Sequence, residues 1–131
     1  MEAKEDLILK DECFEVIGAC MRVHSEMGSG YLEAVYQECL EIEFGLCGIH
    51  FESQVSLKLS YRDRELKQCY KPDFLVYDQI LLEIKTCDRI AAEHQSQVLN
   101  YLSATGCPLG LLVNFGSVGK LDWMRLVHTK E

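Results

Sequence analysis

Three stretches of the chain carry apolar residues at the three-to-four-residue spacing of amphipathic helices. The pattern predicts helices over about residues 11–27, from about residue 31 to Gly48, and over residues 90–105. Gly28 and Gly106 follow the first and third stretches, where glycine commonly ends a helix. The first helix would bury Cys13, Val16, Ile17, Cys20, Val23 and Met27.

Between the second and third helices the apolar period changes to two, which is typical of β-strands. Residues 55–61 alternate apolar and polar side chains and predict a strand with one wet face. Residues 69–77 and 80–86 are apolar on both faces, predict central strands, and are joined through Asp78-Gln79. Closing strands over 109–115 and 121–127 would flank the turn at 116–119, so the order ααβββαββ predicts an α/β sandwich.

Length and composition place the chain among single globular domains. It has 131 residues, 48% of them hydrophobic and 26% charged, without repeats or a run long enough to span a membrane. The start, Met1-Glu2-Ala3-Lys4-Glu5-Asp6, lacks the basic and then apolar order of a signal peptide, which favours a cytoplasmic protein. Seven scattered cysteines without a Cys-x-x-Cys pair predict free thiols that pack as small hydrophobes.

The net charge of −8 is unevenly distributed. Residues 1–43 hold eleven acids and three bases, whereas residues 44–131 hold ten of each. A basic run in the second part is diluted only by Asp63 and Glu65 and contains Lys58, Arg62, Arg64, Lys67 and Lys71. Two interpretations stay open: a local patch for phosphates, or a solvated strand edge that charges protect from pairing.

Asp73, Glu83 and Lys85 interrupt strands that otherwise read as fully buried. Glu83 and Lys85 share a face because side chains alternate along a strand. If an antiparallel turn is centred on Asp78, Asp73 lies directly opposite Glu83, with Cβ atoms about 5 Å apart. Two carboxylates at this short distance repel each other unless one is protonated or a divalent cation lies between them. A structural Glu–Lys ion pair with a strand-capping aspartate is the alternative.

Two helices add polar side chains to this candidate site. On the third helix, His94, Gln97 and Tyr101 share a stripe with apolar residues, so we expect His94 and Gln97 to face the sheet. A histidine in such a stripe is more often a satisfied core residue than a ligand. Glu33 falls in the first turn of the second helix, where a glutamate often serves only the helix dipole or a capping box.

The chain resembles the GxxExxY proteins, a bacterial branch of the PD-(D/E)XK nuclease-like superfamily. The motifs are Gly30-x-x-Glu33-x-x-Tyr36, Asp73, Glu83-x-Lys85 and Gln97-x-x-Asn100-Tyr101-Leu102, supported by Val23-His24 and the segment 110–115. The resemblance covers about residues 17–115 and departs from the family pattern at none of the ligand positions. It implies a restriction-endonuclease-like αβββαβ core with an extra N-terminal helix and a C-terminal strand, in which helices flank a mixed central sheet.

The resemblance also implies roles for individual residues. Asp73, Glu83 and Glu33 would hold Mg²⁺ or Mn²⁺, and Lys85 would orient the attacking water or stabilise charge on the phosphate. Gln97 would belong to the catalytic set. Lys71, Tyr101 and His94 are the candidate substrate-binding residues.

The resulting hypothesis is a metal-dependent nuclease that hydrolyses phosphodiester bonds in DNA, with RNA as the less favoured substrate. Mg²⁺ prefers hard oxygen ligands and keeps waters that leave room for a phosphate. A non-catalytic nucleic-acid- or protein-interaction module on the same fold is the alternative, and purely structural charge pairing is a third reading. A homodimer would help so short a chain to grasp a duplex.

Overall fold

The computed structural model describes residues 8–128, which form three helices and seven strands. In chain order they are α1 (Lys10–Met27), α2 (Glu33–Cys47), β1 (Phe51–Ser53), β2 (Leu57–Tyr61), β3 (Arg64–Tyr70), β4 (Phe74–Val76), β5 (Ile80–Lys85), α3 (Ala92–Thr105), β6 (Leu109–Asn114) and β7 (Asp122–Val127). The N-terminal residues that favoured a cytoplasmic protein lie outside this range. No helix within residues 8–128 is long and apolar enough to cross a membrane.

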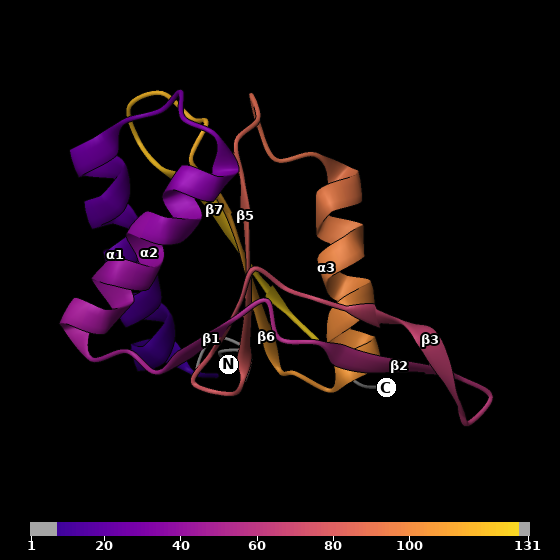
Figure 1. Cartoon of the computed structure of the whole chain (residues 1–131). Coiled ribbons are helices and arrows are strands. Elements are labelled where there is room, and N and C mark those ends of the chain that lie inside the picture. Colours follow the sequence, from indigo (N-terminus) through magenta and orange to yellow (C-terminus); the bar gives the residue numbers. More distant parts are fainter. Residues whose placement is uncertain (1–7, 129–131) are drawn as a thin grey trace, which may run out of the picture.

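A five-stranded mixed sheet in the order β1-β4-β5-β6-β7 forms the centre of the molecule. β5 and β6 pair in parallel, and the other neighbours pair antiparallel. α1 and α2 cover one face of this sheet and α3 covers the other (Figure 1). The mixed α/β architecture with helices flanking a mixed sheet is therefore confirmed.

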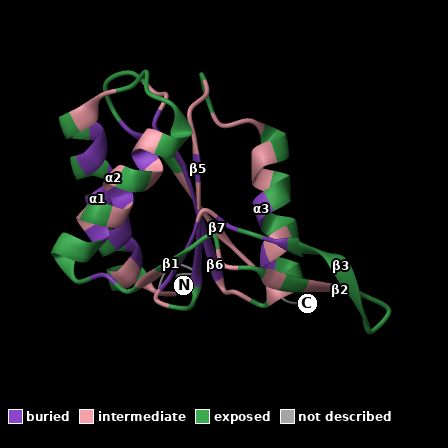
Figure 2. Ribbon diagram, in the orientation of Figure 1, coloured by how far each residue is buried: buried purple, intermediate pink, exposed green. Residues whose placement is uncertain are grey.

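The two faces of the sheet bury separate cores, and β5 contributes to both because its side chains alternate. Ile80, Leu82 and Ile84 pack in the core under α1 and α2, whereas Leu81 packs in the core under α3. The buried positions follow the central strands and the inner helix faces (Figure 2). Glu83 and Lys85 share the parity of Leu81, so these two charged residues belong to the α3 face of the sheet.

The strand prediction is wrong in its details between the second and third helices. The run 69–77 is not one strand: it contains the end of β3 and all of β4, which belong to different sheets. Pro72 lies between them and has no N–H to donate to a ladder, so the chain leaves the β2–β3 hairpin there. β1 was not predicted, because three residues with a single partly buried side chain carry little periodicity.

The helices agree with their predicted positions to within two residues. α2 begins at Glu33 and α3 at Ala92, and both end before glycines in the left-handed conformation, Gly48 and Gly106. Cys13 and Cys20 are buried in the α1 core as predicted. All seven cysteines are free thiols.

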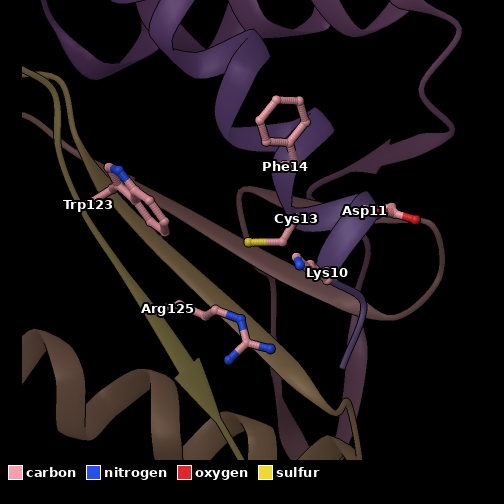
Figure 3. A pocket seen from close by; sticks show the side chains of 6 residues that line it. All are labelled: Lys10, Asp11, Cys13, Phe14, Trp123 and Arg125. Carbon is pink, nitrogen blue, oxygen red and sulfur yellow. The ribbon is translucent and has the colours of Figure 1, made fainter. Parts of the chain in front are cut away.

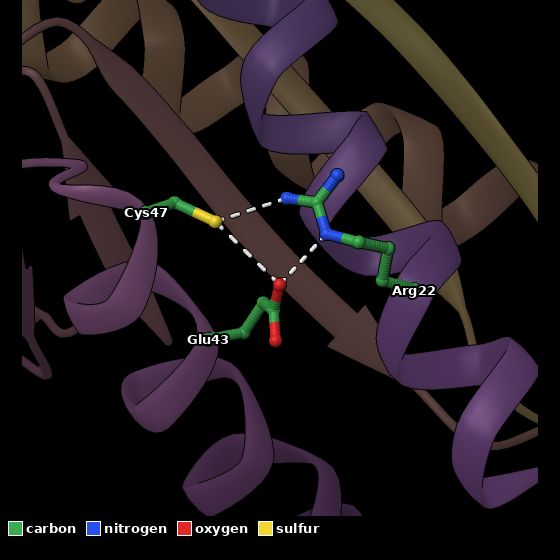
Figure 4. A network of polar contacts seen from close by, with 3 residues as sticks. All are labelled: Arg22, Glu43 and Cys47. Atoms are coloured by element: carbon green, nitrogen blue, oxygen red, sulfur yellow. Dashed lines mark hydrogen bonds and ion pairs between the residues drawn. The ribbon is translucent and has the colours of Figure 1, made fainter.

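Arg22 links the outer surfaces of α1 and α2 (Figure 4). Its Nε lies 2.7 Å from the Glu43 carboxylate and its Nη2 donates to the Cys47 sulfur at 3.1 Å. Hydrogen bonding to Arg22 lowers the pKa of Glu43. Because the Arg22 side chain is exposed, the ion pair contributes little to the stability of the fold.

Candidate active site

The antiparallel pairing of β4 and β5 decides where the predicted carboxylates lie. Phe74 pairs with Leu82, and Val76 pairs with Ile80. Extending this register by one residue places Asp73 opposite Glu83, as the sequence predicted. The connection is centred on Asp78, and the Gln79 N–H donates to the Val76 carbonyl at 3.1 Å. The odd-length turn therefore brings both acids to one end of the hairpin.

Asp73 is held by bonds from three directions. Its carboxylate Oδ2 accepts the Ile84 N–H at 2.8 Å, which ties it to β5. Its carbonyl accepts the Gln54 N–H at 3.2 Å and the Gln37 side-chain amide at 3.1 Å. The residue is half-buried just before β4 begins. These contacts fix the position of the Asp73 carboxylate at the junction of α2, β4 and β5.

Glu83 has an aromatic support that sequence reasoning missed. The Tyr70 hydroxyl donates to the Glu83 carboxylate, and the Tyr70 ring stacks on Tyr101 of α3 with centroids 3.6 Å apart. Burial raises the pKa of Glu83 to about 7, the Tyr70 hydrogen bond opposes the rise, and Asp73 adds to it. The only sequence signal for Tyr70 was its place directly before the Lys71-Pro72-Asp73 segment.

Lys85 ends β5 on the same face as Glu83 and is half-buried. Its carbonyl accepts the Phe115 N–H at 2.8 Å. The fully buried Asn114 fixes the chain just beyond it: Oδ1 accepts the Cys87 N–H at 3.0 Å, and Nδ2 donates to the Cys87 carbonyl at 2.8 Å. Asn114 therefore positions the backbone that leaves Lys85, a role that the sequence did not reveal.

Glu33, the first residue of α2, lines a cavity of about 210 Å³ together with Asp73. Ala34, Gln37, Gln54 and Ile84 complete its lining. The predicted approach of Glu33 toward the strands from the second helix is confirmed at Asp73. Glu83 does not line this cavity. Gln37 follows Glu33 by one helical turn, and this spacing is the signal that could have identified it.

The other positions of the Gly30-x-x-Glu33-x-x-Tyr36 motif shape the loop before α2. Gly30 adopts φ 110°, a conformation that side chains rarely take. Tyr36 is fully buried, its hydroxyl donates to the Gly28 carbonyl at 2.5 Å, and its ring stacks on Phe115 at 4.6 Å. Gly30 and Tyr36 thus hold the start of α2, and with it Glu33, against the sheet.

The third helix buries Val98 and Leu102 of the predicted stripe, and His94 and Tyr101 are half-buried. Gln97 is exposed and so lies outside the core under α3, one helical turn before Tyr101, and its place in the site stays a prediction. The buried face of α3 is centred on Val98 and Leu102, and adjacent residues of a helix point about 100° apart. His94 is half-buried, and its Nδ1 accepts the Ala91 N–H at 3.0 Å, which caps the helix. Lys71 is exposed beside the site.

Two other features lie apart from these residues. A cavity of about 430 Å³ lies between α1 and β7 and is lined by Lys10, Asp11, Cys13, Phe14, Trp123 and Arg125 (Figure 3). A second feature is the exposed trio His50, Glu52 and Asp78, whose ligand atoms lie within 4.8 Å of one another. This trio could hold a metal ion, but it lies at the other end of the β4–β5 hairpin, five residues or about 15 Å from Asp73 and Glu83.

Comparison with known proteins identifies the family. A model described as the PD-(D/E)XK nuclease superfamily matches residues 10–126. The chain belongs to this superfamily. The model names the superfamily and not the GxxExxY branch, which stays a prediction.

A solved structure supports the fold of this superfamily member. The crystal structure of SSO0001 has a TM-score of 0.58 to this chain at 17% sequence identity. The match covers 95% of this chain but only 62% of SSO0001. At this identity the likeness concerns the fold alone. No curated protein sequence matches the chain.

Proposed function

We propose that this PD-(D/E)XK domain is a divalent-metal-dependent nuclease that cleaves phosphodiester bonds in DNA, with RNA as the less favoured substrate. The observation that carries the proposal is the β4–β5 register, which opposes Asp73 to Glu83 and leaves Lys85 on the Glu83 face. Membership of the nuclease superfamily supports the same chemistry.

The donor set fits Mg²⁺ or Mn²⁺. Asp73 and Glu83 are hard oxygen ligands held by the backbone N–H of Ile84 and the hydroxyl of Tyr70, each of which occupies only one side of its carboxylate. Glu33 brings a third carboxylate to the cavity beside Asp73. When bound, a divalent cation would polarise a phosphate oxygen and lower the pKa of an attacking water.

Other residues of the chain would complete the site. Lys85 would donate hydrogen bonds to the attacking water or to the phosphate, with its position set by Asn114 and the β5–β6 pairing. Tyr70 and Tyr101 would hold Glu83 in a fixed orientation. A concavity of about 330 Å³ between the loop before α2 and the loop after β5 offers room for the nucleotide chain. Gln97, one helical turn before Tyr101, stays a candidate for this set.

The test is cleavage of DNA and RNA of mixed sequence with Mn²⁺ or with EDTA. We expect the parent to cleave DNA only with metal, and Asp73→Asn and Lys85→Ala each to lose at least about 100-fold in rate. Glu52→Gln, in the exposed trio, is the matched control. Loss of activity in Glu52→Gln with full activity in Asp73→Asn would move the metal site to the trio. Metal-independent DNA binding without any cleavage would instead favour the interaction module.

A further inference from the structure

The β2–β3 hairpin leaves the body of the protein and carries four of the 13 lysine and arginine residues of the chain. Figure 1 shows it projecting past α3, away from the α1/α2 layer. The six residues from Arg64 to Cys69 are all exposed, whereas the next residue, Tyr70, is buried. A two-stranded ribbon of this kind has little stability of its own. Its projection therefore needs an explanation beyond the packing of the core.

The base of the hairpin is fastened to the candidate active site. Tyr70 donates to Glu83 and stacks on Tyr101, while Leu57 and Leu59 pack against the core under α3. Tyr70 pairs with Leu57 and Arg64 pairs with Tyr61, so the ribbon between these pairs has the length of four steps of β2, about 13 Å. Phosphates of one DNA strand advance by about 3.4 Å along the helix axis, so an arm lying along the axis spans about four of them.

The charge of the arm is opposite to that of the rest of the molecule. Residues 57–71 hold five bases and two acids, in a chain of net charge −8. Glu65 lies 3.7 Å from Lys58 and partly offsets it, which leaves Arg62, Arg64 and Lys67 along the exposed part of the ribbon. The acidic residues gather instead in the first 43 residues, which include α1 and most of α2. A polyanion is thus attracted to the hairpin and repelled from the opposite layer.

The turn at the tip supplies an independent observation. Tyr61 pairs with Arg64, so the loop consists of Arg62 and Asp63 alone, with φ of 50° and 63°. Asn, Asp and Gly suit such a turn, whereas arginine at its first position is strained. The Arg62 guanidinium lies over the Tyr61 ring, 5.6 Å from its centroid, and both side chains are exposed. The sequence thus places the positively charged Arg62 at the tip, although the backbone conformation there favours Asn, Asp or Gly.

We propose that the β2–β3 hairpin is a DNA-binding arm, in which Arg62, Arg64 and Lys67 contact the phosphate backbone of a duplex that enters the site at Glu83. The inference rests on the proposed nuclease function for its choice of ligand. It adds the direction of approach: the duplex reaches the site from the hairpin and the α3 face of the sheet. The contacts are to phosphates, so binding through the arm is independent of base sequence.

The decisive measurement is the salt dependence of binding to a fluorescent 20-base-pair duplex in EDTA, where cleavage is absent. Each phosphate contact contributes about 0.9 to the slope of log affinity against log salt. Removing three contacts by Arg62→Asn, Arg64→Gln and Lys67→Gln should therefore make this negative slope shallower by about 2.7. Between 50 and 200 mM salt, the parent should lose about 40-fold more affinity than the triple variant.

Two control variants separate the arm from general effects. Lys120→Gln removes one exposed base from the β6–β7 connection, which contacts α1 through the His24–Ser117 hydrogen bond, and should leave the slope unchanged. Arg62→Asn alone relieves the strained turn, so it should weaken binding while the melting temperature stays level or rises. Weaker binding therefore cannot be attributed to an unfolded hairpin.

The outcomes distinguish this inference from the proposed function. A parent that does not bind DNA at 50 mM salt, or a triple variant with the parental slope, would overturn the arm. If the parent cleaves DNA with Mn²⁺ while the triple variant retains the parental KM, the nuclease stands and the arm fails. Binding that depends on the arm in a protein that never cleaves would support the arm and reject the nuclease.

Discussion

Replacing Glu83 with glutamine removes an acid whose pKa the fold raises from 4.5 to about 7. The raised pKa means that the native state retains a proton which the unfolded chain releases. Between pH 4.5 and about 7 the native state binds more protons than the unfolded state, so stability falls as pH rises. The stabilising contribution is fully present below pH 4.5 and is lost above about pH 7. Glutamine at this position does not titrate.

The size of the effect follows from the pKa difference. One pKa unit corresponds to about 1.4 kcal/mol, so the shift to about 7 sets an upper limit of about 3 kcal/mol on the stability lost. This limit is a large part of the 5–15 kcal/mol that typically stabilise a domain. We therefore expect Glu83→Gln to match the parent near pH 4.5 and to exceed it by up to about 3 kcal/mol near pH 8, when no metal is present.

The assay is urea unfolding in EDTA at several pH values, read as the difference between variant and parent so that the titration of groups that do not interact with Glu83 cancels. Glu93→Gln, which removes an exposed acid from the first turn of α3, measures the effect of deleting one negative surface charge. A Glu83→Gln difference that stays constant with pH, or that shifts in favour of the parent as pH rises, would refute the reasoning.

Three further changes have distinct expected results. Melting curves with Mn²⁺ and with EDTA should show the parent stabilised by about 2.7 kcal/mol when Mn²⁺ is in hundredfold excess over its Kd. Asp73→Asn should lose most of that stabilisation, whereas Lys85→Ala should keep it. A parent whose melting temperature does not respond to Mn²⁺ would contradict the metal site. Asn114→Ala leaves the backbone N–H and carbonyl of Cys87 without their buried partners, so it should lower the free energy of unfolding in urea by about 3 kcal/mol. A decrease below about 1 kcal/mol would show that water replaces these hydrogen bonds. Tyr70→Phe removes the hydroxyl that donates to Glu83 but keeps the ring stacked on Tyr101. The cleavage rate should therefore fall while the melting temperature without metal changes little. A large drop in melting temperature would show that the hydrogen bond is structural.

Local patterns in the sequence were sufficient for the helices, for β5, β6 and β7, and for the opposition of Asp73 to Glu83. Helical and strand periods depend on neighbouring side chains, which the sequence records directly. The index sum of an antiparallel hairpin depends only on its turn, and the connection centred on Asp78 has the odd length that the candidate site required. The approach of Glu33 to Asp73 was likewise predicted, because the resemblance aligned an early acid of the second helix with the strands.

Only the tertiary structure decided which side chains support these carboxylates. Tyr70 and Tyr101 are far apart in the chain, and they stack because the end of β3 crosses α3. On α3, Val98 occupies the buried face and Gln97 is exposed, a difference that the shared helical stripe did not predict. The division of residues 69–77 between two sheets also depended on partners elsewhere in the chain, β2 for one part and β1 and β5 for the other. Periodicity indicates which face of a helix or strand is buried. The residues that this face contacts depend on how distant elements pack, and no local pattern contains that information.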